Sequence, residues 1–167
     1  MTADTPQTLE TALRAVAPNL LAYFERRAPD REDAADLLGE VMLHAWRRAA
    51  ALPAGPERQR MWLFTIARNV LSNHRRAARS RHAVIEKVRA VLRDLGDEPD
   101  VGAAADVRDA VRRLPEHQRE LVMLVHWDRF TLVEAAELVE INPSTARSRY
   151  AAARLALQQA LGEPIDC

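Results

Sequence analysis

The sequence predicts an all-α protein made of two small helical domains joined by a linker. Apolar residues recur at spacings of three and four along most of the chain, no run alternates as a half-buried strand does, and Gly occurs only 5 times in 167 residues. The helical periodicity is lost once, in the stretch GDEPDVGAAAD. We therefore assign residues 1–93 to a first domain, 94–105 to a linker and 106–167 to a second domain.

The first domain is expected to contain three amphipathic helices. One covers residues 9–24, a second runs from about Arg31 to Arg48, and a third runs from about Arg60 to beyond Arg79. The stretch AALPAGPERQR separates the last two as a loop, and residues 83–95 either extend the third helix or form a short helix of their own. The apolar residues that we place in the core of this domain are Leu9, Leu13, Val16, Leu20, Leu21, Phe24, Leu37, Leu38, Val41, Ala45, Leu63, Ile66 and Val70, with His74 beside them.

The second domain is expected to hold four short helices. The first ends before Pro115 and contains the apolar residues Val107, Ala110, Val111 and Leu114. The second contains Leu121, Val122, Leu124 and Val125. Thr131 and Glu134 form a capping-box pattern at the start of the third helix. Asn142 caps the fourth, where Pro143 occupies the first position and loses no hydrogen bond.

The last two helices have the length and the turn of a helix-turn-helix. A stripe of Ala146, Tyr150, Ala153, Leu157 and Leu161 is predicted to face inward, so Tyr150 is interpreted as a core residue rather than a stacking platform. Arg147 and Ser148 then face outward and Arg149 lies on the flank. Arginine near the start of such a helix is suited to guanine edges and phosphates, although a pair of solvated arginines would give the same pattern.

The third helix of the first domain gives an independent indication of a polyanion partner. The chain has no net charge, but residues 58–93 carry nine Arg and one Lys against one Glu. The side opposite the apolar stripe carries Thr65, Arg68, Asn69, Ser72, Arg75, Arg76 and Arg79. Arginines there offer phosphate contacts, and the interleaved Asn and Ser offer hydrogen bonds to bases. Trp62 and Phe64 could stack on an unpaired base, and core packing is the competing interpretation.

The second helix carries a different outward side. It combines the carboxylates Asp36 and Glu40 with the large apolar residues Leu43 and Trp46. Such a mixture is typical of a protein-binding patch. The alternative is that Leu43 and Trp46 pack under the first helix, and the sequence leaves both interpretations open.

Several function classes are disfavoured by composition. The five histidines are scattered over different helices and the single cysteine is Cys167, so we expect no enzyme activity, no metal and no cofactor. We also expect no signal peptide, no membrane insertion and a cytoplasmic location.

With these motifs in place, the chain resembles the extracytoplasmic-function (ECF) group of bacterial sigma factors. The matching stretches are DREDAADLLGEVMLHAWRR and MWLFTIARNVLSNHRRAARSR, similar to region 2, and LPEHQRELVMLVHWDRFTLVEAAELVEINPSTARSRYAAARLALQQAL, similar to region 4. The resemblance implies an alternative sigma factor that binds core RNA polymerase, through the β′ clamp and β flap, and directs initiation at specific promoters. It also implies promoter DNA as a partner and allows an anti-sigma factor.

The resemblance also implies site residues. Asp36, Glu40 and Trp46 match the helix that binds the polymerase, and Leu43 belongs to the same patch. Asn69 and Asn73 match positions facing the minus-10 strand, followed by Arg75, Arg76 and Arg79 on the basic face that includes Arg68. Residues that match the minus-35 recognition helix are Thr145, Arg147, Ser148 and Arg149.

The sequence departs from the family pattern in the helix-turn-helix. Glu140 lies where the family usually has the glycine of the turn, and Ala151 and Ala152 replace larger or basic residues. A stand-alone helix-turn-helix regulator that binds operator DNA is the alternative function. It accounts for residues 131–161 but leaves the acidic second helix and the basic third helix unexplained.

Overall fold

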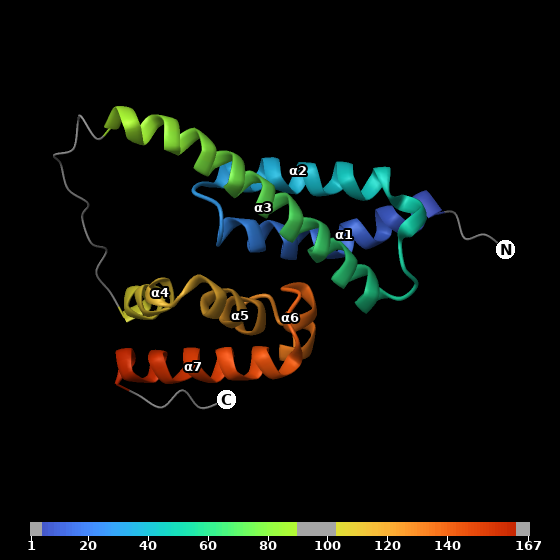
Figure 1. Cartoon of the computed structure of the whole chain (residues 1–167). Helices are drawn as coiled ribbons and strands as arrows, with labels where there is room; N and C mark the ends of the chain where they lie inside the picture. The colour runs from blue at the N-terminus through green and yellow to red at the C-terminus, as the bar shows by residue number, and fades with distance from the viewer. Residues whose placement is uncertain (1–4, 90–102, 163–167) are drawn as a thin grey trace. The chain divides into compact units, whose positions relative to one another are not determined.

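The computed structural model describes residues 5–89 and 103–162 and confirms the all-α prediction. The described residues form seven α-helices and one short 3-10 turn, with no strand among them (Figure 1). The chain divides into two compact units, residues 1–94 and 95–167. Most of the predicted linker lies outside the described residues, and helix α4 begins at Ala103.

The first unit is a bundle of three helices that pack pairwise against one another. It contains α1 (Thr5–Glu25), α2 (Arg31–Arg47), the turn η1 (Ala49–Ala51) and α3 (Pro56–Arg89). Its aromatic centre is Tyr23, whose ring makes edge-to-face contacts with Phe24 at 5.3 Å and with Phe64 at 5.5 Å between centroids. Phe64 is therefore a core residue and not a base-stacking platform, whereas Trp62 is half-buried. Most of the predicted core is confirmed, except that Leu21, Leu38 and His74 are only partly buried.

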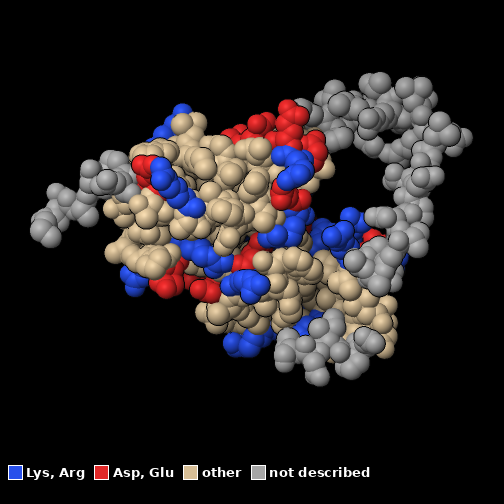
Figure 2. Space-filling view, turned by 180° about the vertical axis from the view of Figure 1, so that it is seen from behind, with Lys and Arg blue, Asp and Glu red and all other residues tan. Residues whose placement is uncertain are grey.

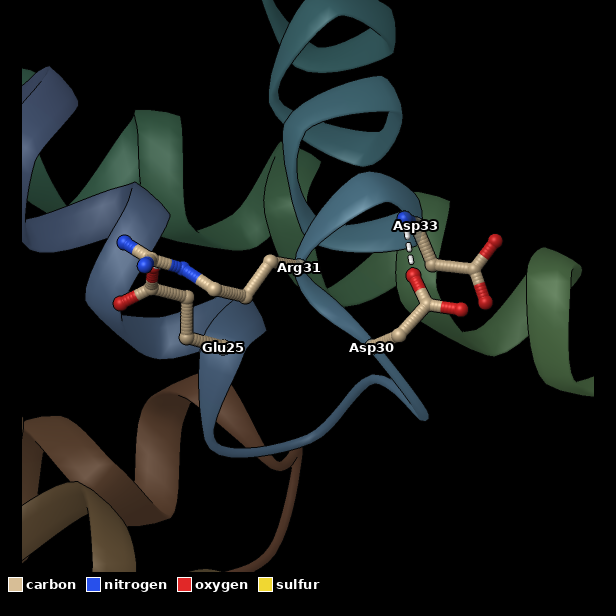
Figure 3. Close-up of polar contacts among 4 residues, drawn as sticks. All are labelled: Glu25, Asp30, Arg31 and Asp33. Atoms are coloured by element: carbon tan, nitrogen blue, oxygen red, sulfur yellow. Dashed lines mark hydrogen bonds and ion pairs between the residues drawn. The ribbon is translucent and has the colours of Figure 1, made fainter.

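The connection from α1 to α2 is set by local polar contacts (Figure 3). Asp30 caps α2, because its Oδ1 accepts a hydrogen bond of 2.8 Å from the backbone N–H of Asp33. Glu25 and Arg31 form an ion pair of 3.1 Å across the turn. This pair is largely exposed and adds little stability, so the cap decides where α2 begins.

Helix α3 differs from the prediction at its start. The predicted loop of residues 50–60 is shorter, since the helix begins at Pro56 rather than at about Arg60. Proline is favourable in the first turn because its missing N–H has no partner there. The helix then continues without a break to Arg89, so residues 83–89 extend it, and its last turns run beyond α1 and α2 in Figure 1. Its 34 residues span about 50 Å.

The second unit contains α4 (Ala103–Arg113), α5 (Glu116–His126), α6 (Leu132–Leu138) and α7 (Pro143–Leu161). Its core joins Ala110, Val111 and Leu114 of α4 to residues of α5 and α7. Val107, which we expected in this core, is 41% exposed, because the buried stripe of α4 begins one turn later at Ala110. Both predicted caps are confirmed: Thr131 and Glu134 form the full capping box, and Asn142 accepts from the N–H of Thr145 at 2.8 Å.

Among the described residues of this unit, two that are not glycine have left-handed backbone conformations. Arg129, just before α6, has a φ of 57°, and Glu140, in the turn between α6 and α7, has a φ of 58°. Residues with a Cβ adopt this region at a cost, whereas glycine does not. The glycine-free turn noted in the sequence therefore keeps the conformation that glycine favours.

The strain at Glu140 gives a first prediction. Glu140→Gly should stabilise the α6–α7 pair by about 0.5–1 kcal/mol, because the left-handed penalty exceeds the extra entropy of glycine in the unfolded chain. Glu137→Gly, in the last turn of α6, should instead destabilise it by up to about 1 kcal/mol. Hydrogen exchange of α6 and α7 amides measures both changes. Equal destabilisation by the two variants would show that the turn is not strained.

A polar contact joins α5 to α7. The Nε2 atom of His126 lies 2.7 Å from the Tyr150 hydroxyl, and the two rings are stacked with centroids 6.0 Å apart. Partial burial, and then the positive charge of Arg154, lower the pKa of His126 below its usual value of 6.5. In the neutral ring, Nε2 accepts from the tyrosine hydroxyl when Nδ1 carries the proton, and donates to the hydroxyl oxygen in the other tautomer.

The lowered pKa predicts a pH dependence of stability. The unfolded chain binds the proton more tightly than the folded chain, so the contribution of His126 is fully present above about pH 6.5 and is lost as the pH falls below that value. Exchange protection of α5 and α7 should therefore decrease more between pH 7.5 and 5.5 in the wild type than in His126→Gln. An identical decrease in both proteins would assign the effect to other groups.

Candidate functional site

Three outward helix faces carry the residues singled out in the sequence. In each case one side of the helix is buried and the opposite side carries the residues. Two faces belong to the first unit, on α2 and α3, and one belongs to the second unit, on α7.

The α2 face is formed by residues that all point away from the core. Ala34, Leu37, Val41 and Ala45 are buried in α2, which turns Asp36, Glu40, Leu43 and Trp46 to the surface. Leu43 is 50% exposed and Trp46 45%, so they do not pack under α1. We call these four residues the α2 patch.

The charge of the α2 patch is continued toward the start of the helix. Glu32 is exposed one turn before Asp36, and we had not singled it out, although its spacing of four from Asp36 could have indicated it. Figure 2 shows acidic side chains gathered along the upper edge of the first unit, which α2 follows in Figure 1. The surface therefore combines carboxylates toward the N-terminus of α2 with exposed apolar side chains toward its C-terminus.

The α3 face consists of two adjacent stripes on one continuous helix. Spacings of four, three and four place Arg68, Ser72, Arg75 and Arg79 in one stripe. Spacings of four and three place Asn69, Asn73 and Arg76 in the other. Asn69, Asn73, Arg76 and Arg79 are exposed, and Arg68 and Arg75 are half-buried. The stripes put cations and amides side by side along several helical turns, which suits a nucleic-acid strand that offers phosphates and bases together.

The α7 face surrounds the start of the last helix. Ala146, Ala153 and Leu157 are buried, and Tyr150 packs against the same core, as predicted. Arg147 and Ser148 are exposed, whereas Thr145 and Arg149 are half-buried.

The two arginines of the α7 face leave the helix in different directions. Two residues along a helix correspond to about 200° around its axis, so Arg147 and Arg149 project from nearly opposite flanks with Ser148 between them. The Ser148 hydroxyl donates to the carbonyl of Thr145 at 3.3 Å and keeps lone pairs that can accept. The side chains of Ser144 and Asn142 are hydrogen-bonded to each other at 2.7 Å, which adds to the cap.

The contacts of α7 with its neighbours hold this face in place. The stacked pair of His126 and Tyr150 ties α7 to the end of α5, and the cap at Asn142 fixes the first turn after α6. The arginines are thus carried by a helix whose rotation is determined on both sides.

The described residues contain no group of three His, Cys, Asp or Glu side chains able to hold a metal ion. Among the same residues, no helix is long and apolar enough to cross a bilayer.

Family models match both units. Residues 12–81 match sigma-70 region 2, and residues 104–157 match sigma-70 region 4. The first match contains the α2 and α3 faces and the second contains the α7 face.

Individual relatives agree with this result. The chain is 30% identical over 147 residues to the ECF RNA polymerase sigma factor SigL of Mycobacterium tuberculosis, covering 84% of this chain and 83% of SigL. It is 28% identical over 157 residues to the ECF sigma factor EcfG of Rhodopseudomonas palustris, covering 92% and 85%.

Solved structures show the same fold. The sigma factor RpoE of Bartonella quintana, solved in complex with the anti-sigma factor NepR, has a TM-score of 0.71 and 25% identity, over 96% of this chain and 99% of RpoE. CnrH, solved with the cytosolic domain of CnrY, shares the fold with a TM-score of 0.64 and 19% identity, over 94% and 89% of the two chains. The chain therefore belongs to the ECF sigma factors, the alternative sigma factors that direct transcription initiation by RNA polymerase.

Proposed function

We propose that each of the three faces of this sigma factor binds a different partner during transcription initiation. The α2 patch binds core RNA polymerase, the α3 face binds the melted minus-10 strand, and the α7 face enters the major groove of the minus-35 element. The observation that supports this assignment most directly is that the three faces carry different types of side chain. Carboxylates with exposed apolar residues lie on α2, amides with arginines on α3, and arginines at a capped helix start on α7.

The polymerase assignment rests on the exposure of Leu43 and Trp46. Large apolar side chains at a surface cost free energy unless a partner covers them, and tryptophan is among the residues that contribute most to interfaces. The carboxylates beside them complement a basic partner surface. The β′ clamp is the proposed partner of this patch, and the β flap is the proposed partner of the second unit.

The DNA assignments rest on the stripes of α3 and on the start of α7. Arginines on α3 neutralise phosphates, while Asn69 and Asn73 carry donors and acceptors for base edges. On α7 the helix N-terminus favours a phosphate, and Arg147 is the exposed arginine nearest to it.

Several further properties are part of the same proposal. Residues 1–93 and 106–167 act as separate domains joined by the linker 94–105. The protein is cytoplasmic, where the polymerase is, and has no catalytic activity of its own. An anti-sigma factor is a proposed regulator, because the related RpoE was solved with one.

A stand-alone operator-binding regulator is the competing function. It requires only α6 and α7, so it leaves the α2 patch and the α3 stripes without a role. Run-off transcription tests the difference directly: the protein with core polymerase should initiate at its promoter, and the protein alone should bind duplex promoter DNA weakly. Tight binding without polymerase, together with no initiation, would favour the regulator.

The exposure of Trp46 predicts a separation of binding from stability. Trp46→Ala should weaken core polymerase binding by about tenfold or more, because truncating an interface tryptophan typically costs about 2 kcal/mol or more. The midpoint of thermal unfolding should fall much less than on loss of a buried tryptophan, which costs about 3–5 kcal/mol, since Trp46 is 45% exposed. His44→Ala, an exposed change on the flank of the same helix, serves as the control. A large loss of thermal stability with unchanged binding would assign Trp46 to the core.

Arg147 and Arg149 of the α7 face are expected to give different binding losses. Arg147→Ala should cost roughly 1–3 kcal/mol and relax the preference at one promoter position, because a bidentate base contact is lost. Arg149→Ala should weaken binding evenly across sequences and reduce the salt slope by about one. Holoenzyme binding to a panel of minus-35 variants at two salt concentrations measures both, with Arg113→Ala on α4 as the charge control. A uniform loss in both variants would make Arg147 a phosphate contact only.

A further inference from the structure

The outward side of α7 becomes apolar after its first turns. Ala151, Ala152 and Leu155 are exposed there, and Leu155 is 57% exposed. The other helices of the second unit pack against the buried side of α7, so none of them covers these three side chains. Ala151 and Ala152 are also the positions at which the sequence departs from the larger or basic residues of the family pattern.

One ridge joins this apolar surface to the exposed arginine of the α7 face. Spacings of four place Arg147, Ala151 and Leu155 next to one another along the helix, and all three are exposed. Four residues advance about 6 Å along a helix, which is close to the spacing of two base pairs. In a helix that lies along a DNA groove, the ridge therefore presents a guanidinium, a methyl and an isobutyl group at intervals of about two base pairs.

The charge of α7 indicates which partner covers this ridge. The helix contains Arg147, Arg149 and Arg154 and neither Asp nor Glu. Such a helix attracts a polyanion and offers no carboxylate to a basic protein surface. The ridge is also continuous with the first turns of α7, which are proposed to enter the major groove. Charge and continuity therefore both favour DNA as the occupant.

The side chains of the ridge also favour one base. Thymine is the base whose major-groove edge carries an apolar group, the 5-methyl group, and alanine is among the side chains that contact it. The small side chain of Ala151 lets the helix backbone approach the base edges closely. A longer basic side chain at this position would instead donate hydrogen bonds, which a methyl group cannot accept.

We infer that Ala151 and Leu155 read the 5-methyl groups of thymines in the minus-35 element, beside the base pair that Arg147 contacts. The inference rests on the proposed role of the α7 face and adds the base that the apolar part of this face selects. The promoter is then expected to carry thymines about two and about four base pairs from the guanine that Arg147 reads.

Replacing thymine by deoxyuridine removes only the methyl group and tests the inference directly. The probes are duplexes of the promoter that supports run-off transcription, each with one minus-35 thymine replaced by deoxyuridine. Wild-type holoenzyme should bind two of them about fourfold more weakly, because burying one methyl group contributes a free energy equivalent to about that factor. One of these losses should vanish in Ala151→Gly and the other in Leu155→Ala. Ala160→Gly, the same change at an exposed position near the end of α7, should keep both losses.

The comparison of thymine with deoxyuridine is made within each variant, so effects of the substitution on folding or on polymerase binding cancel. Equal losses in the wild type and in both variants would assign the methyl contacts to other residues and overturn the inference. A minus-35 element without thymine would overturn it as well.

Arg147→Ala is measured beside these variants to keep the inference distinct from the proposed function. If Arg147→Ala weakens binding and deoxyuridine has no effect in the wild type, the α7 face enters the groove but reads no methyl group, and the inference fails. If neither change affects binding, the assignment of the α7 face to the minus-35 element is itself wrong.

Discussion

The rotation of each helix about its own axis is the constraint on which all three surfaces depend. That rotation is fixed by stripes of fully buried side chains, several of them alanine. Ala34 and Ala45 of α2, Ala67 of α3, and Ala146 and Ala153 of α7 have no exposed surface. Alanine lets two helix backbones approach closely, so a helix cannot turn about its axis without losing the contact or creating overlap. The outward residues are then presented in one direction only.

On α7 this constraint connects the packing of the helix to the direction in which its first turns present Arg147 and Arg149. Ala146 and Ala153 set the inward side, the contact between His126 and Tyr150 adds a polar tie to α5, and the cap at Asn142 fixes the first turn. These three interactions have different physical origins and agree on one orientation. The backbone that carries the two arginines is therefore already oriented, so in the proposed complex with DNA only their side chains would need ordering.

The first unit uses the same constraint for two surfaces of opposite character. Tyr23 and Phe64 hold α1 and α3 together, and the Arg27 guanidinium lies 3.8 Å from the centroid of the Tyr23 ring. Around this centre, α2 turns carboxylates and apolar groups outward, while α3 turns arginines and amides outward. One small core thus supports an acidic and partly apolar face on α2 and a face of arginines and amides on α3, without mixing their charges.

The sequence by itself determined the all-α class, the division into two helical units, and the inward stripe of nearly every helix. It did so because amphipathic spacing and capping residues act locally, as the confirmed caps at Thr131 and Asn142 show. Only the tertiary structure decided which apolar residues stay exposed. Leu43, Trp46 and Val107 are as apolar as the residues of the core. Whether they are exposed depends on whether another helix covers them. The same holds for Phe64, which is buried by Tyr23 from a helix about 40 residues away. The left-handed backbone at Glu140 likewise follows from how the turn joins α6 to α7, because residue type alone does not specify a dihedral angle.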